Sequence, residues 1–508
     1  MRHYTTLAAA GIAAVLLATT ACAPGAHRGH DRDTSYDGYH EPHRGYHDRG
    51  PTFQDYGVNP QVATTHENRS TFALDVDTGS YTVTRGYLND GVLPDPASVR
   101  TEEFINYFDQ DYHPPPDGMG IHVDGTPVPF LTDPATRVVR VGLQAATVDD
   151  TARDPVNLTI IVDTSGSMAG HNMQMVRAGL GRLVDSLGPD DAVAIVTFST
   201  TAELRLEMTP ATRKDRIRAV IAALEPQRWT NLEAGLRLGY RQAMAHLRED
   251  GLNRVVLLSD GVANVGETDP HRLADQIAQK AGRSTQLAVV GVGRETYNEV
   301  VLEQFANNGN GFYAYVDSVG EAERLFVDDL TGTLQAVALD AKVQVTFNPD
   351  VVSDFRLLGY ENRQLAHDQM RDDTVDGGEV GAGHNVTALY EVRLHEQVLR
   401  EVARPWGDAP LATVDVRWID PDHGDPRERG ASMTVSQLAP SWEQAPPRLR
   451  QGITVAAFAE CLRHAPWCQY VSLAGVADHA WSLTRTLPHD EQVGEFARLA
   501  RTAADLAF

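Results

Sequence analysis

The chain of 508 residues predicts an α/β fold whose central unit is a doubly wound, mostly parallel six-stranded sheet. Between about residues 157 and 335, short apolar segments alternate with segments that space their apolar residues as helices do, the pattern of a parallel sheet whose strands are joined by helices. The short segments, such as NLTIIVD at 157–163, are almost continuously apolar, as expected for strands covered on both faces. A chain of this length is also expected to contain more than one domain.

The elements of this central unit follow one another in a regular order. Strands are predicted at 157–163, 191–199, 202–209, 253–261, 285–293 and 311–317. Helices are predicted at 173–187, 213–224, 231–247, 270–282, 299–309 and 320–335. The third strand alternates polar and apolar residues, which suits an edge of the sheet. Sheets of this kind bind ligands beyond the carboxyl ends of their strands.

The N-terminal part of the chain carries export and tethering signals. Residues 1–21 are typical of a signal peptide, because Arg2 precedes an apolar run that is too short to span a bilayer. Cys22 follows a small residue and resembles the lipidated cysteine of a bacterial lipobox; the alternative is simple secretion with a chance cysteine. Residues 22–59 are rich in His, Arg, Asp, Tyr and Gly and predict a disordered tether, with transition-metal binding by its histidines as the alternative.

Two further regions flank the central unit, which we place at residues 153–335. Residues 60–152 predict an α+β region, with a helix in RTEEFINYF and a strand in TRVVRVGLQA. Residues 336–508 predict a β-rich domain that starts as a small β-sandwich and ends in helices. Cys461 and Cys468 form either a disulfide, which an oxidising compartment permits, or a pair of buried thiols.

The composition excludes one class of partner. The formal net charge is −25, so no basic field is present to displace the counterions of a nucleic acid. The acidic surplus is compatible with cations or basic partners, and a soluble acidic surface is sufficient to explain it.

Oxygen-bearing side chains are expected to gather at the carboxyl ends of two strands. Asp163 ends the first parallel strand, and Ser165 and Ser167 follow it in DTSGS. Asp260 ends the strand VVLLSD, and Thr230 precedes a helix between these two strands. Two carboxylates and three hydroxyls suit a hard cation, either Mg²⁺ or else Mn²⁺ or Ca²⁺. Because three of these ligands are neutral, we expect the cation to accept another anionic oxygen, from a Glu or Asp of a partner protein.

These residues resemble the metal-ion-dependent adhesion site of von Willebrand factor A domains. The resemblance consists of Asp-x-Ser-x-Ser in DTSGS, a separate threonine, and the aspartate of SDG. It implies a doubly wound, Rossmann-like fold that binds protein ligands through Mg²⁺, and a metal site made of Asp163, Ser165, Ser167, Thr230 and Asp260. From about residue 59 onward, segments such as STFALDVDTGSY, VRTEEFINYF and GEVGAGHNVTALYEV are similar to bacterial von Willebrand A lipoproteins of the YfbK-like group.

Other motifs suggest alternative roles. Asp77 begins DTGS, which resembles the aspartic-protease signature, but a second Asp-Thr-Gly is missing and a strand end followed by a turn explains the motif. Ser165 lacks the Gly-x-Ser-x-Gly elbow of a nucleophilic serine. Trp229 either lines the binding face or packs in the core. Two histidines are expected to have structural positions, on a solvent-facing helix and in a turn: His171 and His384.

The sequence therefore predicts a membrane-anchored lipoprotein that binds protein partners through a divalent cation, with an adhesion or scaffolding role in the cell envelope and no enzymatic activity. The lipid on Cys22 would attach the exported chain to the outer membrane or the cell surface. Two alternatives stay open. One is an envelope hydrolase whose central domain delivers the substrate, and the other is a passive structural lipoprotein with an empty site.

Overall fold

The structure is a computed structural model, and it describes residues 53–74, 76–148, 154–249, 251–261, 265–280, 285–293, 299–309, 311–329, 335–375, 377–400 and 406–507. The predicted signal peptide, the predicted lipidation site Cys22 and the predicted tether up to residue 52 lie outside the described residues. Among the helices that are described, none combines the length and the apolar character needed to cross a bilayer.

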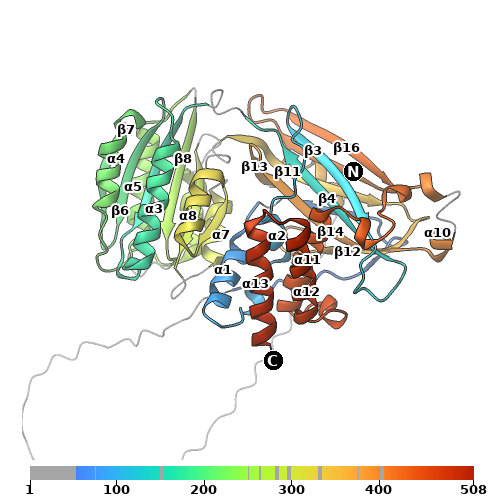
Figure 1. Cartoon of the computed structure of the whole chain (residues 1–508). Helices are drawn as coiled ribbons and strands as arrows, with labels where there is room; N and C mark the ends of the chain where they lie inside the picture. The colour runs from blue at the N-terminus through green and yellow to red at the C-terminus, as the bar shows by residue number, and fades with distance from the viewer. Residues whose placement is uncertain are drawn as a thin grey trace, which may run out of the picture. The chain divides into compact units, whose positions relative to one another are not determined.

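A six-stranded sheet with the order β10-β9-β8-β5-β6-β7 forms the central unit (Figure 1). Its strands are β5 (Val156–Asp163), β6 (Ala192–Phe198), β7 (Ala202–Pro210), β8 (Leu252–Ser259), β9 (Gln286–Val292) and β10 (Tyr313–Val316). Only the edge strand β7 runs antiparallel to its neighbour in this sheet; the other described pairings are parallel. The predicted fold class, a mostly parallel six-stranded α/β sheet, is confirmed.

Helices cover both faces of this sheet, because the strands are apolar on both sides. One face packs against α3 (His171–Ser186), α4 (Lys214–Ala222) and α8 (Val319–Arg324). The other face packs against α5 (Leu232–Ala245), α6 (Pro270–Lys280) and α7 (Glu299–Asn308). The two hydrophobic cores meet at β5, where Ile160 faces the first set of helices and Ile161 faces the second, as the alternation of a strand requires.

Two five-stranded sheets lie outside the central unit, and each combines strands from both sides of it in the sequence. The first has the order β1-β12-β14-β4-β3, and the second has the order β13-β11-β15-β16 with β2 also paired to β11. Their bounds are β1 (Val62–Ala63), β2 (Arg69–Ala73), β3 (Met119–Thr126), β4 (Thr136–Ala145), β11 (Ala336–Phe347), β12 (Val352–Leu358), β13 (Gly378–Gly381), β14 (Asn385–Leu394), β15 (Pro410–Ile419) and β16 (Pro426–Thr434).

The two sheets share one hydrophobic core and form a β-sandwich. Val139 of β4 and Tyr390 of β14 enter this core from the first sheet, and Phe72 of β2 and Val343 of β11 enter it from the second. The sequence placed the sandwich within residues 336–508, whereas strands β1 to β4 also contribute to it. The domain boundaries themselves stay predictions.

A helical layer also joins the two ends of the chain. It contains α1 (Gly79–Asn89) and α2 (Thr101–Asn106) together with α11 (Pro447–Leu462), α12 (Leu473–Thr486) and α13 (Glu491–Leu506); a short helix, α10 (Glu396–Arg400), lies in the β-rich part. Aromatic rings connect these helices, because Phe108 packs on Phe496 and Phe104 packs on Phe458, with ring centroids 5.7 and 6.2 Å apart. The N-terminal region and the C-terminal helices therefore share a core.

The DTGS motif and the start of α1 contact the edge strand β10 of the central sheet. The carboxylate of Asp77 accepts a hydrogen bond from the backbone N–H of Tyr313 at 3.0 Å, and the hydroxyl of Thr82 donates to the carbonyl of Tyr315 at 3.1 Å. A Cβ atom on Gly79 would lie 2.6 Å from the Tyr313 ring, so the close approach requires glycine. Asp77 of the motif and Thr82 of α1 thus bond backbone groups that an edge strand would otherwise expose.

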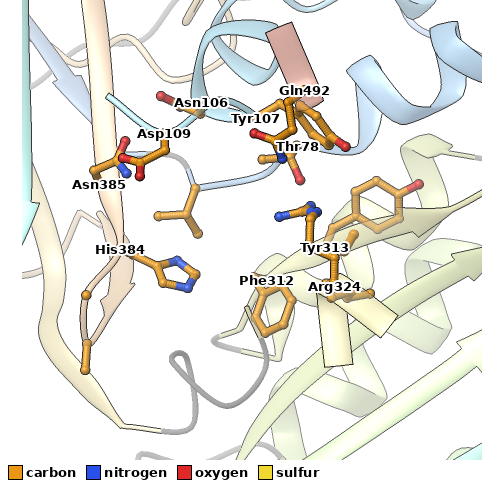
Figure 2. Close-up of a pocket in the computed structure, with 15 residues that line it drawn as sticks. Thr78, Asn106, Tyr107, Asp109, Phe312, Tyr313, Arg324, His384, Asn385 and Gln492 are labelled. Carbon is orange, nitrogen blue, oxygen red and sulfur yellow. The ribbon is translucent and has the colours of Figure 1, made fainter. Parts of the chain in front are cut away.

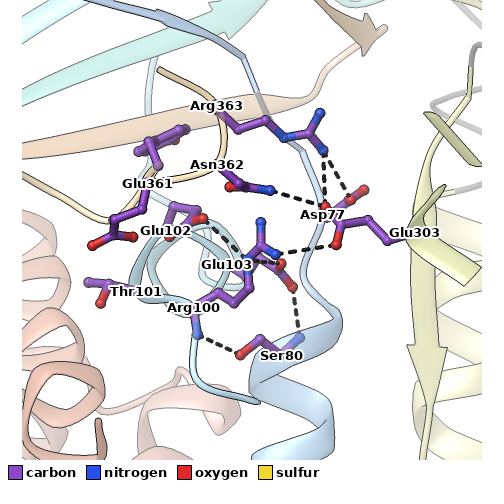
Figure 3. Close-up of polar contacts among 12 residues, drawn as sticks. Asp77, Ser80, Arg100, Thr101, Glu102, Glu103, Glu303, Glu361, Asn362 and Arg363 are labelled. Carbon is purple, nitrogen blue, oxygen red and sulfur yellow. Dashed lines mark hydrogen bonds and ion pairs between the residues drawn. The ribbon is translucent and has the colours of Figure 1, made fainter. Parts of the chain in front are cut away.

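Buried charges surround the same junction (Figure 3). Arg100 lies 3.1 Å from the carboxylate of Glu103 and 3.2 Å from that of Glu303 on α7, and Arg363 lies 3.6 Å from Glu303 and 3.7 Å from Asp77. These ion pairs link the N-terminal region, the central unit and the β-rich part of the chain. Asp77 is therefore a structural residue here. It lies between the end of β2 at Ala73 and the start of α1 at Gly79, so the motif leads into a helix and the predicted strand end followed by a turn is wrong.

Candidate metal-binding site

Asp163 stands at the carboxyl end of β5 and is completely buried. Its Oδ1 atom accepts a hydrogen bond from the backbone N–H of Ser165 at 2.7 Å, and its Oδ2 atom accepts one from the hydroxyl of Ser259 at 2.8 Å. Both carboxylate oxygens are therefore oriented by neighbours. The carboxylate at the end of this buried strand is thus hydrogen-bonded by the backbone of the loop that follows it and by the last residue of β8.

The two serines of the loop lie next to each other. The Oγ atoms of Ser165 and Ser167 are 3.1 Å apart, and the short helix η2 (Gly166–Met168) holds this part of the loop. Ser165 is buried, whereas Ser167 is exposed. The pair thus extends from the buried carboxylate of Asp163 to the protein surface.

The loop that carries Thr230 is bonded to the loops that follow β5 and β6. The backbone N–H of Gln227 donates to the carbonyl of Thr164 at 2.5 Å, and the backbone N–H of Asn231 donates to the carbonyl of Ser199 at 2.7 Å. The hydroxyl of Ser199 also donates to the side-chain oxygen of Gln227 at 2.7 Å. Thr230 itself is buried between these anchored residues.

Asp260 directly follows β8, which lies beside β5 in the sheet. It is buried, and its charge acts on Asp163: burial and the neighbouring Asp260 together raise the pKa of Asp163 to about 7. The carbonyl of Thr230 accepts a hydrogen bond from the backbone N–H of Val265, which ties the loop after Asp260 to the loop of Thr230. The three segments that carry the five predicted residues are therefore bonded to one another at one edge of the sheet.

The donor set fits a hard divalent cation. It consists of oxygen atoms, with two carboxylates whose repulsion a cation would offset. Among the described residues, no group of three or more His, Cys, Asp or Glu gathers as a metal site. A cation held by these five residues would consequently depend on the three hydroxyls, which leave part of its charge available to a further anionic ligand.

Three residues that the sequence analysis did not single out build this site. Ser259 orients Asp163, and Gln227 and Ser199 fix the loop of Thr230. Only Ser259 had a signal in the sequence, because it immediately precedes Asp260 in SDG. The hydrogen bonds of Gln227 and Ser199 depend on how two loops meet, which no local pattern encodes.

The single residues of uncertain role are now placed. Trp229 is 50% exposed, so the alternative in which it packs in the core is wrong. His171 is the exposed first residue of α3. His384 lies in a turn, where its backbone N–H donates to the carbonyl of Gly381 at 3.2 Å. Both histidines occupy the kind of position that the sequence predicted.

A cavity of about 430 Å³ lies elsewhere in the molecule. Figure 2 shows His384 and Arg324 facing it, and the cavity also borders Tyr313, the first residue of β10. Because β5 and β10 belong to the parallel part of the sheet, the start of β10 lies at the end opposite to Asp163. The cavity is therefore separate from the candidate metal site.

Family comparisons match three consecutive parts of the chain. Residues 48–140 match a family described as von Willebrand factor, and residues 157–331 match the von Willebrand factor type A domain. Residues 332–506 match a family described as Uncharacterized protein YfbK, C-terminal. The second match covers the six-stranded sheet and all five candidate metal ligands.

Individual proteins extend this result. The Uncharacterized protein YfbK of Escherichia coli (strain K12) is 31% identical over 466 residues, which cover 89% of this chain and 80% of that protein. The inter-alpha-trypsin inhibitor heavy chain H4 of Homo sapiens is 25% identical over 43% of this chain and 24% of that protein. The solved structure of a von Willebrand factor type A protein from Catenulispora acidiphila covers 76% of this chain and 90% of its own, at 15% identity and a TM-score of 0.43. From the first of these similarities and the family matches, the chain belongs to the YfbK family and contains a von Willebrand factor type A domain.

Proposed function

We propose that this protein is a membrane-anchored lipoprotein that binds protein partners through a divalent cation, in an adhesion or scaffolding role in the cell envelope. The observation that supports the proposal is the buried pair Asp163 and Asp260 beside the serines of the DTSGS loop. The residues that would hold the cation are Asp163, Ser165, Ser167, Thr230 and Asp260. When bound, the cation, Mg²⁺ or else Mn²⁺ or Ca²⁺, would supply a Lewis-acidic position for an oxygen of the partner.

The arrangement suits recognition of a carboxylate. Asp163 is completely buried and is held by two hydrogen bonds. It would therefore face a bound cation from inside the protein, where a partner protein cannot reach it. Ser167 is exposed and marks the open side. An Asp or Glu of the partner would approach from that side and complete the coordination.

A binding role is proposed in preference to catalysis. Asp77, the candidate acid of a hydrolase, bonds to the backbone of Tyr313 and lies 3.7 Å from Arg363 in a buried ion cluster. Ser165 contacts another serine hydroxyl and a carboxylate, and neither arrangement is that of an activated nucleophile. We therefore propose that the protein has no hydrolytic activity.

The test of the metal site is titration calorimetry with Mg²⁺ on wild type and on Asp163→Ala, with Asp185→Ala as a control because Asp185 is an exposed acid on α3. Wild type and the control are expected to bind Mg²⁺, and Asp163→Ala is expected to lose it. Equal affinity in all three proteins would refute the assignment.

The anchor is tested separately. Growth with a labelled fatty acid is expected to label the protein and to leave Cys22→Ser unlabelled, and fractionation is expected to move the variant out of the membrane. A Cys22→Ser protein that keeps the label would show that Cys22 is not lipidated.

A further inference from the structure

Trp229 directly precedes Thr230, one of the five candidate metal ligands. It is 50% exposed, whereas the next residue, Thr230, is 4% exposed. A large apolar side chain that is half exposed contributes little to folding stability, because its stabilising effect comes from burial. The exposed indole is therefore a feature of the surface beside the site and contributes little to the core.

The backbone of Trp229 is strained. Its φ angle is +59°, in the left-handed region that bulky residues rarely adopt. Residues in such conformations persist when the surrounding structure determines them, and they cluster at binding sites. A glycine at this position would relieve the strain, yet the residue present is tryptophan, which has the largest of all side chains.

The flanking residues fix the loop on both sides of Trp229. The carbonyl of Arg228 accepts a hydrogen bond from the hydroxyl of Thr200 at 3.3 Å. On the other side, the side chain of Asn231 caps α5 through the N–H of Ala234 at 3.1 Å and donates to the carbonyl of Thr200 at 3.3 Å. These hydrogen bonds oppose a shift of the loop that would release the strain at Trp229.

The same loop borders the open side of the metal site. A Cβ atom on Gly166 would lie 3.4 Å from the carbonyl oxygen of Gln227, which places the loop before Trp229 against the DTSGS loop. Gly166 and Ser167 on the first loop and Arg228 and Trp229 on the second are all exposed. Trp229 and Arg228 therefore belong to an exposed loop that adjoins the loop of Ser165 and Ser167.

We propose that Trp229 is a specificity-determining residue, which selects an acidic partner segment carrying an apolar side chain next to the carboxylate that reaches the cation. This proposal rests on the proposed function of the metal site. An apolar side chain packed on the indole removes apolar surface of both from water. The positive charge of Arg228 attracts an acidic segment and repels a cationic side chain that would otherwise bind to the indole of Trp229.

The experiment uses the full chain and two labelled synthetic octapeptides that contain a single aspartate. They are identical except that leucine precedes the aspartate in one and glycine in the other. In Mg²⁺, fluorescence anisotropy is expected to show about tenfold tighter binding of the leucine peptide, the change that burial of one leucine side chain supports. Chelation of the metal with EDTA is expected to abolish binding of both peptides.

Two variants assign this preference to Trp229. Trp229→Ala and Trp229→Gly are both expected to bind the two peptides equally while keeping the Mg²⁺ affinity of the wild type, and the glycine variant suits the positive φ angle, so it guards against misfolding. The matched control is Trp481→Ala, because Trp481 is 59% exposed on α12 and is expected to leave the preference unchanged.

The outcomes separate this proposal from the proposed function. If both Trp229 variants keep the leucine preference, the role of Trp229 is refuted and the metal site is unaffected. If Mg²⁺ binds but neither peptide does, the proposed partner chemistry is refuted while the metal site stands. If Mg²⁺ itself fails to bind to the wild type, the proposed function is refuted.

Discussion

Arg85 of α1 donates two hydrogen bonds to the carboxylate of Asp317, the residue after β10. Its Nε lies 2.8 Å from Oδ2 and its Nη2 lies 2.5 Å from Oδ1. Both side chains are almost completely buried. Arg85 also reaches Glu321 of α8 at 2.8 Å and Glu495 of α13 at 3.2 Å. One guanidinium thus joins the N-terminal helix, the type A domain and the C-terminal helices.

Removal of this guanidinium is expected to destabilise the whole junction. Arg85→Met leaves Asp317 buried without its cation and removes one of the two arginines that pair with Glu321, and breaking such a buried pair typically costs about 3–5 kcal/mol. Thermal unfolding monitored by circular dichroism measures the loss. Arg182→Met is the control, because Arg182 pairs with Glu323 of the same helix α8 in solvent, and its melting temperature should match that of the wild type.

The carboxylate of Glu321 predicts an acid-dependent part of the stability. Burial raises its pKa, but Arg324 and Arg85 outweigh burial and hold the pKa below the usual 4.5. A lowered folded-state pKa contributes stability that is complete above the unfolded value and disappears as the pH falls through the folded value. The difference in unfolding free energy between wild type and Glu321→Gln is therefore expected to be constant above pH 4.5 and to shrink below it. A difference that grows on acidification would contradict this.

Cation binding is expected to reverse the effect of Asp260 on stability. Without metal, at pH 8, Asp260→Asn removes the charge repulsion between the buried side chains of Asp260 and Asp163. The substitution is therefore expected to stabilise the metal-free protein by about 1 kcal/mol. With saturating Mg²⁺, only the wild type gains stability from binding. Melting temperatures in EDTA and in Mg²⁺ measure both effects. A Mg²⁺-induced rise in Asp260→Asn equal to that of the wild type would exclude Asp260 from the site.

The two glycines Gly79 and Gly181 predict opposite responses to alanine. A Cβ atom on Gly79 would collide with the ring of Tyr313, so Gly79→Ala is expected to cost about 1–3 kcal/mol. A Cβ atom on Gly181, within α3, meets open space, so Gly181→Ala is expected to stabilise the protein by about 0.5–1 kcal/mol. Denaturant unfolding of both variants checks the pair, and a neutral Gly79→Ala would contradict the close approach of α1 to β10.

The cysteines Cys461 and Cys468 are both free thiols in the structure, so the predicted disulfide stays untested. Burial and the adjacent Cys468 raise the pKa of Cys461 above its usual value, and its thiol donates to the carbonyl of Val471 at 3.1 Å. Native alkylation with iodoacetamide at pH 8 is therefore expected to modify Cys468 and spare Cys461. Peptide mass spectrometry reads the two sites. Absence of any adduct even after denaturation, followed by labelling of both cysteines after reduction, would indicate the disulfide instead.

The central domain was predictable because its signals are local. Continuous apolar strands, helical spacing and the acids at strand ends all occur within short segments, and parallel strands must place their carboxyl ends at one edge. Asp163 and Asp260 were therefore expected to meet, and Asp260 is near enough to contribute to the raised pKa of Asp163. The two serines of DTSGS follow from their position directly after β5.

The tertiary structure alone decided how the flanking regions assemble. Strand β11 pairs with β2, which lies more than 250 residues earlier in the sequence, and no local pattern records such a partner. The same is true of the contact between Asp77 and Tyr313, and of the exposure of Trp229, whose loop is held by Thr200 and Asn231. Residue type and spacing determine which elements form, whereas long-range packing determines which of their surfaces stay open to a partner.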